Sequence, residues 1–167
     1  PYNLGEGKLA GAEENDIYYY KGLCYRELGK ESEALGCFHK ATVGSSEPAQ
    51  AFFYNDQQPD KIFYQGLAWR ALGDEKKARS RFNKLIKHGE KHLFDNCKID
   101  YFAVSLPDLA IWEEDLNKRN LLHCNYVMGL GHLGLGNLVK ARSFLEEVRK
   151  LDVNHQGGQI HLNMCNK

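Results

Sequence analysis

Two histidines have the spacing of metal ligands. His88 and His92 stand four positions apart, which would place both imidazoles on one face of a helix. Gly89 lies between them, however, and no glutamate follows the first histidine as it does in zinc proteases. We therefore interpret them as solvated histidines past a helix end, and we expect no metal site.

Three consecutive acids are the other candidates for catalysis. Glu113, Glu114 and Asp115 could supply an acid/base pair, but adjacent carboxylates on a helix diverge and no nucleophile lies nearby. They more simply mark a helix boundary. The sequence has no glycine-rich phosphate loop, no nucleophile elbow and no Cys–His spacing typical of catalysis. We predict that this segment is not an enzyme and that it uses no cofactor.

Charge argues against nucleic-acid and membrane partners. Residues 74–92 carry seven lysines or arginines against three acids, but no aromatic residues interleave on that face, so we interpret it as a solvated outer surface. Across the chain, 22 basic residues balance 22 acidic ones, which leaves no global field. No apolar run approaches the ~20 residues that a membrane span needs.

The cysteines indicate a reducing compartment. The chain has five, which is an odd number, and they are scattered without a CxxC pair. This pattern fits reduced thiols better than a disulfide framework, and no signal peptide opens the sequence. We predict a cytoplasmic protein, in which the cysteines within helices act as small core residues.

One skeleton of residues occurs three times and organises the chain. Its clearest copy contains Gly66, Trp69, Gly73, Ala78 and Phe82. The other copies are Gly22, Tyr25, Gly29, Ala34, Phe38 and Gly129, His132, Gly136, Ala141, Leu145. Recurrence of this kind is the signature of a repeat architecture.

Each part of the skeleton has a physical role. The first glycine costs about 1 kcal/mol inside a helix, so its recurrence indicates a close approach of two helices. The second glycine suits a helix end in the left-handed conformation. Asp74 and Asn137 then stand where a second helix would be capped. Apolar residues at helical spacing follow, so each unit is predicted to be a helix, a tight turn and an antiparallel helix.

The unit resembles the tetratricopeptide repeat, whose signature runs W-x2-L-G-x2-Y, then A-x3-F, then P. This sequence departs from it at two places in every copy, and further at Trp69 in the second copy and at Asn125 and His132 in the third. The signature leucine is replaced by Lys21, Gln65 and Met128, and the closing proline by Ser46, Glu90 and Val153. The resemblance implies an all-α fold, a tetratricopeptide-type solenoid of three helical hairpins at about residues 15–48, 59–92 and 122–155.

The remaining segments are expected to link or cap this solenoid. Residues 1–14 are interpreted as a linker from a preceding domain, and residues 155–164 as the start of a capping helix within a solenoid that spans residues 15–167. The insertion at 49–58 is predicted to hold a short helix that starts at Pro48. The insertion at 93–121 is rich in aromatic residues, and we expect Tyr101, Phe102 and Trp112 to dock it on the solenoid or on a neighbouring domain.

In this family the first helix of each pair lines a concave groove, and the resemblance implies which residues do so here. They are Asp16, Tyr19, Leu23, Arg26 and Glu27, then Asp60, Phe63, Leu67, Arg70 and Ala71, then His123, Tyr126, Leu130, Leu133 and Gly134. Within this set we expect Arg26 and Arg70 to hold a peptide carboxylate, flanked by the recurring aromatic and leucine residues. The alternative is that the aromatic and leucine residues only pack between repeats.

The whole chain also looks like the C-terminal repeat segment of large bacterial proteins, in which the repeats follow a β-rich domain of unknown function suspected of sugar-related chemistry. Two hypotheses result. The chain is a scaffold that binds a protein, a peptide or its own upstream domain, or it is an accessory part of a carbohydrate-active enzyme whose aromatic insertions wall an active site elsewhere. Homodimerisation through uncapped solenoid ends is compatible with either.

Overall fold

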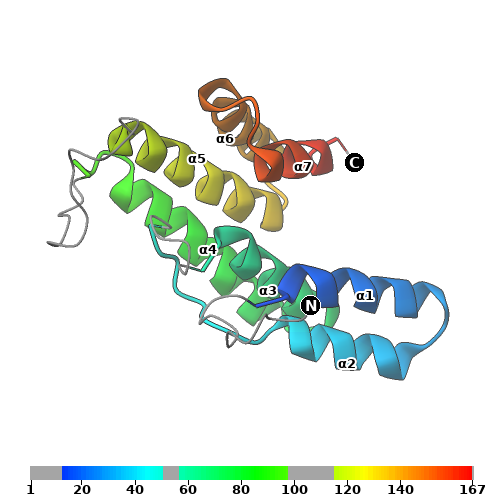
Figure 1. Cartoon of the computed structure of the whole chain (residues 1–167). Helices are drawn as coiled ribbons and strands as arrows, with labels where there is room; N and C mark the ends of the chain where they lie inside the picture. The colour runs from blue at the N-terminus through cyan, green and yellow to red at the C-terminus, as the bar shows by residue number, and fades with distance from the viewer. Residues whose placement is uncertain (1–12, 51–56, 98–114, 167) are drawn as a thin grey trace, which may run out of the picture.

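The computed structural model describes residues 13–50, 57–97 and 115–166, and these residues form helices without any strand (Figure 1). The helices are α1 (Asn15–Glu27), α2 (Glu31–Ala41), α3 (Pro59–Ala71), α4 (Glu75–His92), α5 (Leu116–Gly134), α6 (Leu138–Leu151) and α7 (Gln156–Met164). The predicted all-α fold is confirmed.

The helices are arranged as successive hairpins. α1 pairs with α2, α3 with α4 and α5 with α6, and α7 packs on α6 as the capping helix that the sequence predicted (Figure 1). The first helices of neighbouring hairpins also touch, α1 with α3 and α3 with α5. The result is a helical-hairpin solenoid in which α1, α3, α5 and α7 follow one another along one side.

The recurring first glycine is where the two helices of each hairpin meet. A β-carbon on Gly22 would lie 2.6 Å from the ring of Phe38, and one on Gly66 would lie 2.4 Å from the ring of Phe82. In the third hairpin, a β-carbon on Gly129 would lie 2.8 Å from the side chain of Leu145. The prediction of a close helix approach is therefore confirmed in all three copies.

The second glycine ends the first helix of each hairpin. Gly29, Gly73 and Gly136 have φ angles of 72°, 84° and 78°, a left-handed conformation that strains any residue with a β-carbon. Two capping predictions have different outcomes. Asp74 accepts a hydrogen bond from the backbone N–H of Lys77, whereas Asn137 makes no capping bond. Its amide instead lies 3.4 Å from the Nδ1 of His132.

The second and third hairpins are joined by the tight contact of α4 with α5. A β-carbon on Gly134 would lie 2.2 Å from the ring of Phe82, and one on Gly131 would lie 2.7 Å from the carbonyl oxygen of Phe82. On α4, a β-carbon on Gly89 would lie 2.8 Å from the carbonyl oxygen of Cys124. Glycines on both helices thus let their backbones touch, which seats the third hairpin directly on the second.

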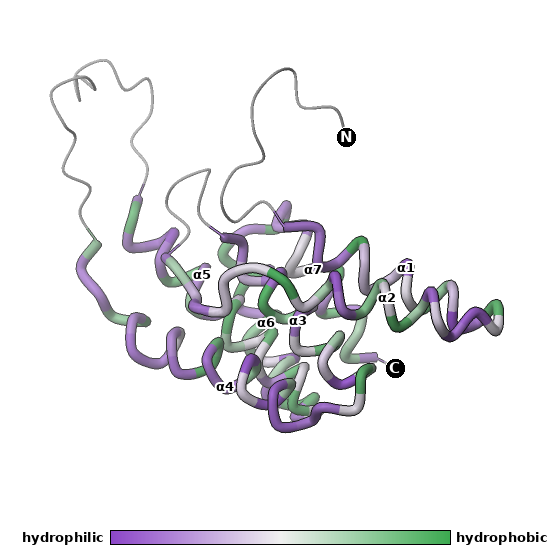
Figure 2. Tube along the Cα trace, turned by 90° about the horizontal axis from the view of Figure 1, so that it is seen from below, coloured by the Kyte–Doolittle hydropathy of each residue, from purple (hydrophilic) through white to green (hydrophobic). Residues whose placement is uncertain are grey.

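The basic segment at residues 74–92 forms α4, which is markedly two-sided. Its buried residues are Ala78, Phe82, Leu85, Ile86 and Gly89. Figure 2 shows long hydrophilic stretches along this helix. Most of its lysines and arginines are exposed, while Arg81 binds Gln65 and Lys84 binds Ser46 and Glu47. Interpretation as a solvated outer face is correct for most of these cations.

The segment that follows the first hairpin differs from its prediction. Residues 45–50 are not helical, although Pro48 was expected to start a helix; the rest of that predicted helix lies outside the described residues. Its backbone carbonyls make hydrogen bonds with side chains from later parts of the chain instead. The carbonyl of Ser45 accepts from Gln57 and Gln65, and the carbonyl of Ala49 lies 2.8 Å from the Nε2 of His123.

The cysteines are free thiols, and most behave as core residues. Cys37, Cys97, Cys124 and Cys165 are buried. Cys24 is exposed on α1, so the prediction that it is a core residue is wrong. It falls on the outward side of the first hairpin, where no later helix covers it.

Several predictions concern residues that the structure does not describe. The linker lies almost wholly within residues 1–12, and Tyr101, Phe102 and Trp112 lie within residues 98–114. Their docking roles stay predictions. Within the described part of the chain, no helix is long and apolar enough to cross a membrane.

Candidate binding groove

Two adjoining cavities open along the face formed by α1, α3, α5 and α7. The larger cavity has a volume of about 800 Å³ and lies between the start of α3, the first half of α5 and the α6–α7 connection. The smaller cavity has a volume of about 370 Å³ and lies between α1, α3 and α7. Asp60 and Gly157 line both cavities, so the two adjoin at these residues, and we call them together the groove.

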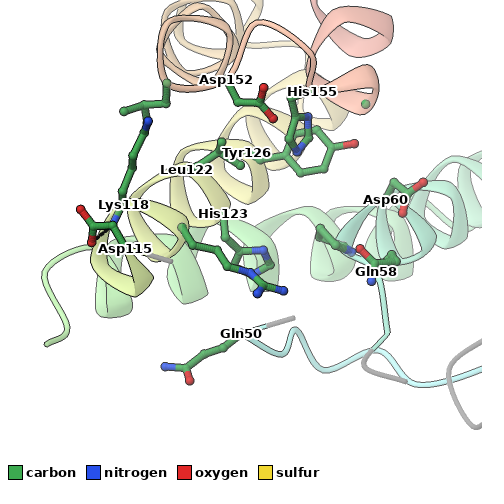
Figure 3. A pocket seen from close by; sticks show the side chains of 14 residues that line it. Gln50, Gln58, Asp60, Asp115, Lys118, Leu122, His123, Tyr126, Asp152 and His155 are labelled. Atoms are coloured by element: carbon green, nitrogen blue, oxygen red, sulfur yellow. Dashed lines mark hydrogen bonds between the residues drawn. The ribbon is translucent and has the colours of Figure 1, made fainter. Parts of the chain in front are cut away.

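The larger cavity carries charges of both signs (Figure 3). Asp115 and Lys118 lie at one end of it and Asp60 at the other, with His123 and Tyr126 between them. Asp115 is held in place because it caps α5, accepting from the backbone N–H groups of Asn117 and Lys118. The prediction that the acids near residue 115 mark a helix boundary is therefore confirmed for Asp115.

Tyr126 joins the larger cavity to α7. Its hydroxyl lies 3.1 Å from the Nδ1 of His161, and its ring packs edge-on against His155 at 4.7 Å between centroids. Burial raises the pKa of the Tyr126 hydroxyl well above its ordinary value. The hydroxyl is therefore a neutral hydrogen-bonding group and not a base.

The histidines of α7 are also neutral. His155 caps the helix, since its Nδ1 accepts from the backbone N–H of Gly158 at 2.8 Å, which requires an unprotonated nitrogen. Burial lowers the pKa of both His155 and His161. Across the groove, burial also lowers the pKa of His123 to about 4. No serine or cysteine stands among the described residues that line either cavity.

The two predicted groove arginines are engaged within their own hairpins. Arg70 makes two hydrogen bonds of 2.9 Å to Glu75, and its guanidinium lies over the ring of Phe82. Arg26 repeats the arrangement with Glu31 and Phe38, and it also donates to the carbonyl of Ala71. These arginines clamp the turn of each hairpin, and they line neither cavity.

The third hairpin replaces the whole arrangement with apolar residues. Leu133 stands where the others have arginine, Leu138 where they have glutamate, and Leu145 where they have phenylalanine. The three residue types change together, which supports the interpretation of the arginines as parts of the hairpin. Both guanidiniums already have a bidentate carboxylate partner in the same repeat.

The aromatic and leucine positions of the predicted groove mostly lie between helices. Phe63 and Leu130 are buried, Tyr19, Leu23 and Leu67 are half-buried in core contacts, and Tyr126 is the one of these that lines the larger cavity. Other positions carried over from the family do reach the groove. Asp16, Asp60 and His123, the first in each set of five, line the cavities.

Sequence reasoning missed the contribution of α7 to the groove. His155, Gly157, Ile160 and His161 all line it. The predicted capping helix could have indicated this contribution, because α7 follows α1, α3 and α5 on the groove side, where the first helix of another hairpin would lie. The five-residue skeleton does not recur within residues 156–167, so it pointed to no groove position there.

His88 and His92 are less solvated than predicted. Their rings lie 4.6 Å apart within the last turns of α4, and the ring of His123 lies 5.9 Å from that of His88. His88 is half-buried, and burial lowers its pKa to about 4. Among the described residues, no group of three or more histidine, cysteine or acidic side chains is arranged to hold a metal ion.

We expect the protein to lose stability below about pH 6.5 because of its buried histidines. The pKa is lowered at His88, His123, His155 and His161 by burial in the folded state. The unfolded chain therefore binds these protons more readily. Stability is complete above the ordinary histidine pKa and falls as the pH drops from there.

The His155→Asn variant tests this expectation. Asparagine can still cap α7 but cannot titrate, so the variant should lose less stability than the parent between about pH 7.5 and pH 5. Denaturant unfolding followed by far-UV circular dichroism at each pH measures the difference. An equally steep pH dependence in the two proteins would contradict the role given to His155.

Comparison with known proteins agrees with the hairpin architecture. A family model described as tetratricopeptide repeat matches residues 16–42 and 62–88, which cover α1–α2 and most of α3–α4. Among solved structures, the chain is similar to one described as the first TPR of Spaghetti (RPAP3) bound to an HSP90 peptide. That chain is 16% identical, the match covers 96% of each chain, and the TM-score is 0.31. Two segments of the chain thus match the tetratricopeptide repeat, and the described part of the chain is a helical-hairpin solenoid.

Proposed function

We propose that this protein is a non-catalytic scaffold that binds a protein or peptide segment in the groove along α1, α3, α5 and α7. The observation that carries the proposal is the junction of the two cavities at Asp60 and Gly157. Together the two cavities are lined by residues of all three hairpins, from Lys118 on α5 to Tyr20 on α1, and an extended chain suits such a lining better than a compact small molecule does.

The chemistry of the groove supports a peptide ligand. Carboxylates, imidazoles and amides alternate with the apolar surfaces of Leu122, Tyr126 and Ile160. A peptide main chain needs hydrogen-bond partners along its length, and its side chains need separate pockets. The ligand can be a segment of another protein or of a domain that precedes this one in the same polypeptide.

The arginines contribute indirectly in this proposal. Arg26 and Arg70 hold the first two hairpins closed, and the first helices of these hairpins present Asp16 and Asp60 to the groove. Selectivity then comes from residues near the start of each first helix and from α7.

A peptide selection with matched tryptophan variants tests the proposal. A phage library of random peptides is panned on the immobilised chain, and recovered peptides are measured by fluorescence polarisation. Leu122→Trp adds bulk to the lining of the larger cavity and should weaken binding by about tenfold or more, since overpacking a site costs ~1–3 kcal/mol.

The control variant places the same bulk outside the groove. Val139 is 85% exposed on α6 and lines neither cavity, so Val139→Trp should leave affinity unchanged. Circular dichroism confirms that both variants are folded. Peptides that respond equally to both changes, or to neither, would rule out this groove as the binding surface.

A further inference from the structure

The smaller cavity is lined by groups that accept hydrogen bonds or attract cations. Asp16 and Tyr20 come from α1, Asp60 and Tyr64 from α3, and His161 from α7. Of the described residues that line it, none is a lysine or an arginine. Five side chains from three helices thus present carboxylate, phenol and imidazole groups to one space.

The negative charge of this cavity is only partly neutralised. Asp16 pairs with Lys61, whose ammonium lies 2.5 Å from its carboxylate. Asp60 faces both Lys61 and the like charge of Asp16, and burial raises its pKa above the ordinary value. One cation therefore serves two carboxylates, which leaves room for a second positive charge.

His161 is an independent sign that a hydrogen-bond donor is missing. The side chain is 2% exposed, and its Nδ1 lies 2.7 Å from the carbonyl oxygen of Gly157. A carbonyl can only accept, so this shorter contact places the proton on Nδ1; the Tyr126 hydroxyl, 3.1 Å from the same nitrogen, is a second acceptor of that proton, and Nε2 is left as a bare acceptor. That Nε2 is buried and has no partner among the residues that the structure describes. Buried acceptors are nearly always satisfied in folded proteins, so this one calls for a further donor.

Two tyrosines provide an aromatic wall. The hydroxyls of Tyr20 and Tyr64 lie 3.2 Å apart, and their ring centroids are 5.5 Å apart. Tyr20 is also largely exposed, so its ring can be reached from solvent. Aromatic faces attract cations, and they favour planar ones that can stack on them.

We propose that the smaller cavity binds the guanidinium of an arginine side chain from the partner segment. The planar guanidinium donates along several directions at once, which matches the carboxylate of Asp60, the Nε2 of His161 and the tyrosine rings. A lysine ammonium would meet the charge but would not stack. This inference rests on the proposed peptide-binding function, since the arginine belongs to the bound segment.

Three small amides test the inference with the protein as it is. Nα-acetyl-arginine amide, the lysine analogue and the citrulline analogue are titrated into the ¹⁵N-labelled chain and followed by amide chemical shifts. The arginine compound should shift amides of α1, α3 and α7 around Asp16, Asp60 and His161. Citrulline keeps the shape of arginine but lacks its charge, and it should bind at least ~10-fold more weakly. Equal binding of arginine and citrulline, or shifts confined to other helices, would overturn the proposal.

The Asp60→Asn variant separates this role from a structural one. Because burial disfavours the charge of Asp60, the neutral variant should fold at least as well as the parent while its affinity for the arginine amide falls by ~10-fold or more. Asp74→Asn is the matched control. Asp74 lines neither cavity and its replacement can still cap α4, so arginine binding should not change. Unchanged binding by Asp60→Asn would refute the assignment.

The outcome is distinguishable from failure of the peptide-binding proposal. Suppose that selected peptides bind and are weakened by Leu122→Trp, but that none contains an arginine whose binding is weakened by Asp60→Asn. The peptide-binding proposal is then supported and the arginine inference is refuted. If the arginine amide binds in the smaller cavity but the binding of no peptide responds to Leu122→Trp, the arginine site is supported and the peptide-binding proposal is refuted.

Discussion

Replacing Phe82 by alanine should lower the free energy of unfolding by about 3–5 kcal/mol, the largest effect that we expect from a single truncation in this chain. The ring is fully buried and fills the space against both Gly66 in its own hairpin and Gly134 in the next one. The guanidinium of Arg70 also loses the ring face beneath it. Neither glycine has a side chain that could relax into the cavity.

Phe38→Ala is the matched control for this prediction. Phe38 is equally buried and has the same contacts with Gly22 and an arginine, but it lies in the first hairpin and no glycine of another hairpin closes over its ring. Its loss should therefore cost less than the loss of Phe82. Equilibrium denaturation in urea measures both. Equal costs, or a larger cost for Phe38→Ala, would show that the contact with α5 adds nothing to stability.

Adding one methyl group at Gly131 should destabilise the protein by about 1–3 kcal/mol. Its β-carbon would lie 2.7 Å from the carbonyl oxygen and 2.6 Å from a side-chain carbon of the two α4 residues that it faces, Phe82 and Ile86. A backbone oxygen cannot rotate away. The two longest helices must therefore move apart, which loosens the contact that seats the third hairpin on the second.

The same substitution at Gly36 should have the opposite sign. Gly36 lies within α2, and a β-carbon there would meet nothing within 4 Å. Alanine then only reduces the freedom of the unfolded chain and improves helix propensity, which should stabilise the protein by about 0.5–1 kcal/mol. Thermal and urea unfolding of the two variants provide the test. If Gly131→Ala stabilises the protein as Gly36→Ala does, the close contact of α4 with α5 does not require a glycine at position 131.

Much of the fold follows from local patterns that need only a few neighbouring residues. Gly66 lies at a helix contact, Gly73 at a helix end and Phe82 in the core, as their residue types predict. The skeleton predicts hairpins because its residues are in contact within one repeat. Local propensity was a weaker guide where polar groups find partners beyond their own turn. Pro48 starts no helix, and the side chain of Asn137 makes no capping hydrogen bond.

The site depended far more on contacts between repeats. Arg26 and Arg70 have the chemistry to hold a partner's carboxylate, but each is already paired with the glutamate that stands five positions later in the chain. Asp60 and His161 become neighbours only because α7 lies across α5 and approaches α3. The stacking of hairpins, and not the order of residues in any one of them, brings these groups together.

The sequence by itself determined the three hairpins, their turns and the capping helix, because helical periodicity and glycine stereochemistry act over a few residues. Only the tertiary structure decided which polar side chains line the groove. That choice depends on the superhelical stacking of the hairpins, which is set by the glycine contacts between α4 and α5 and by the seating of α7 on α6. Burial then determines the charge state of each groove residue, and burial is a property of the assembled solenoid.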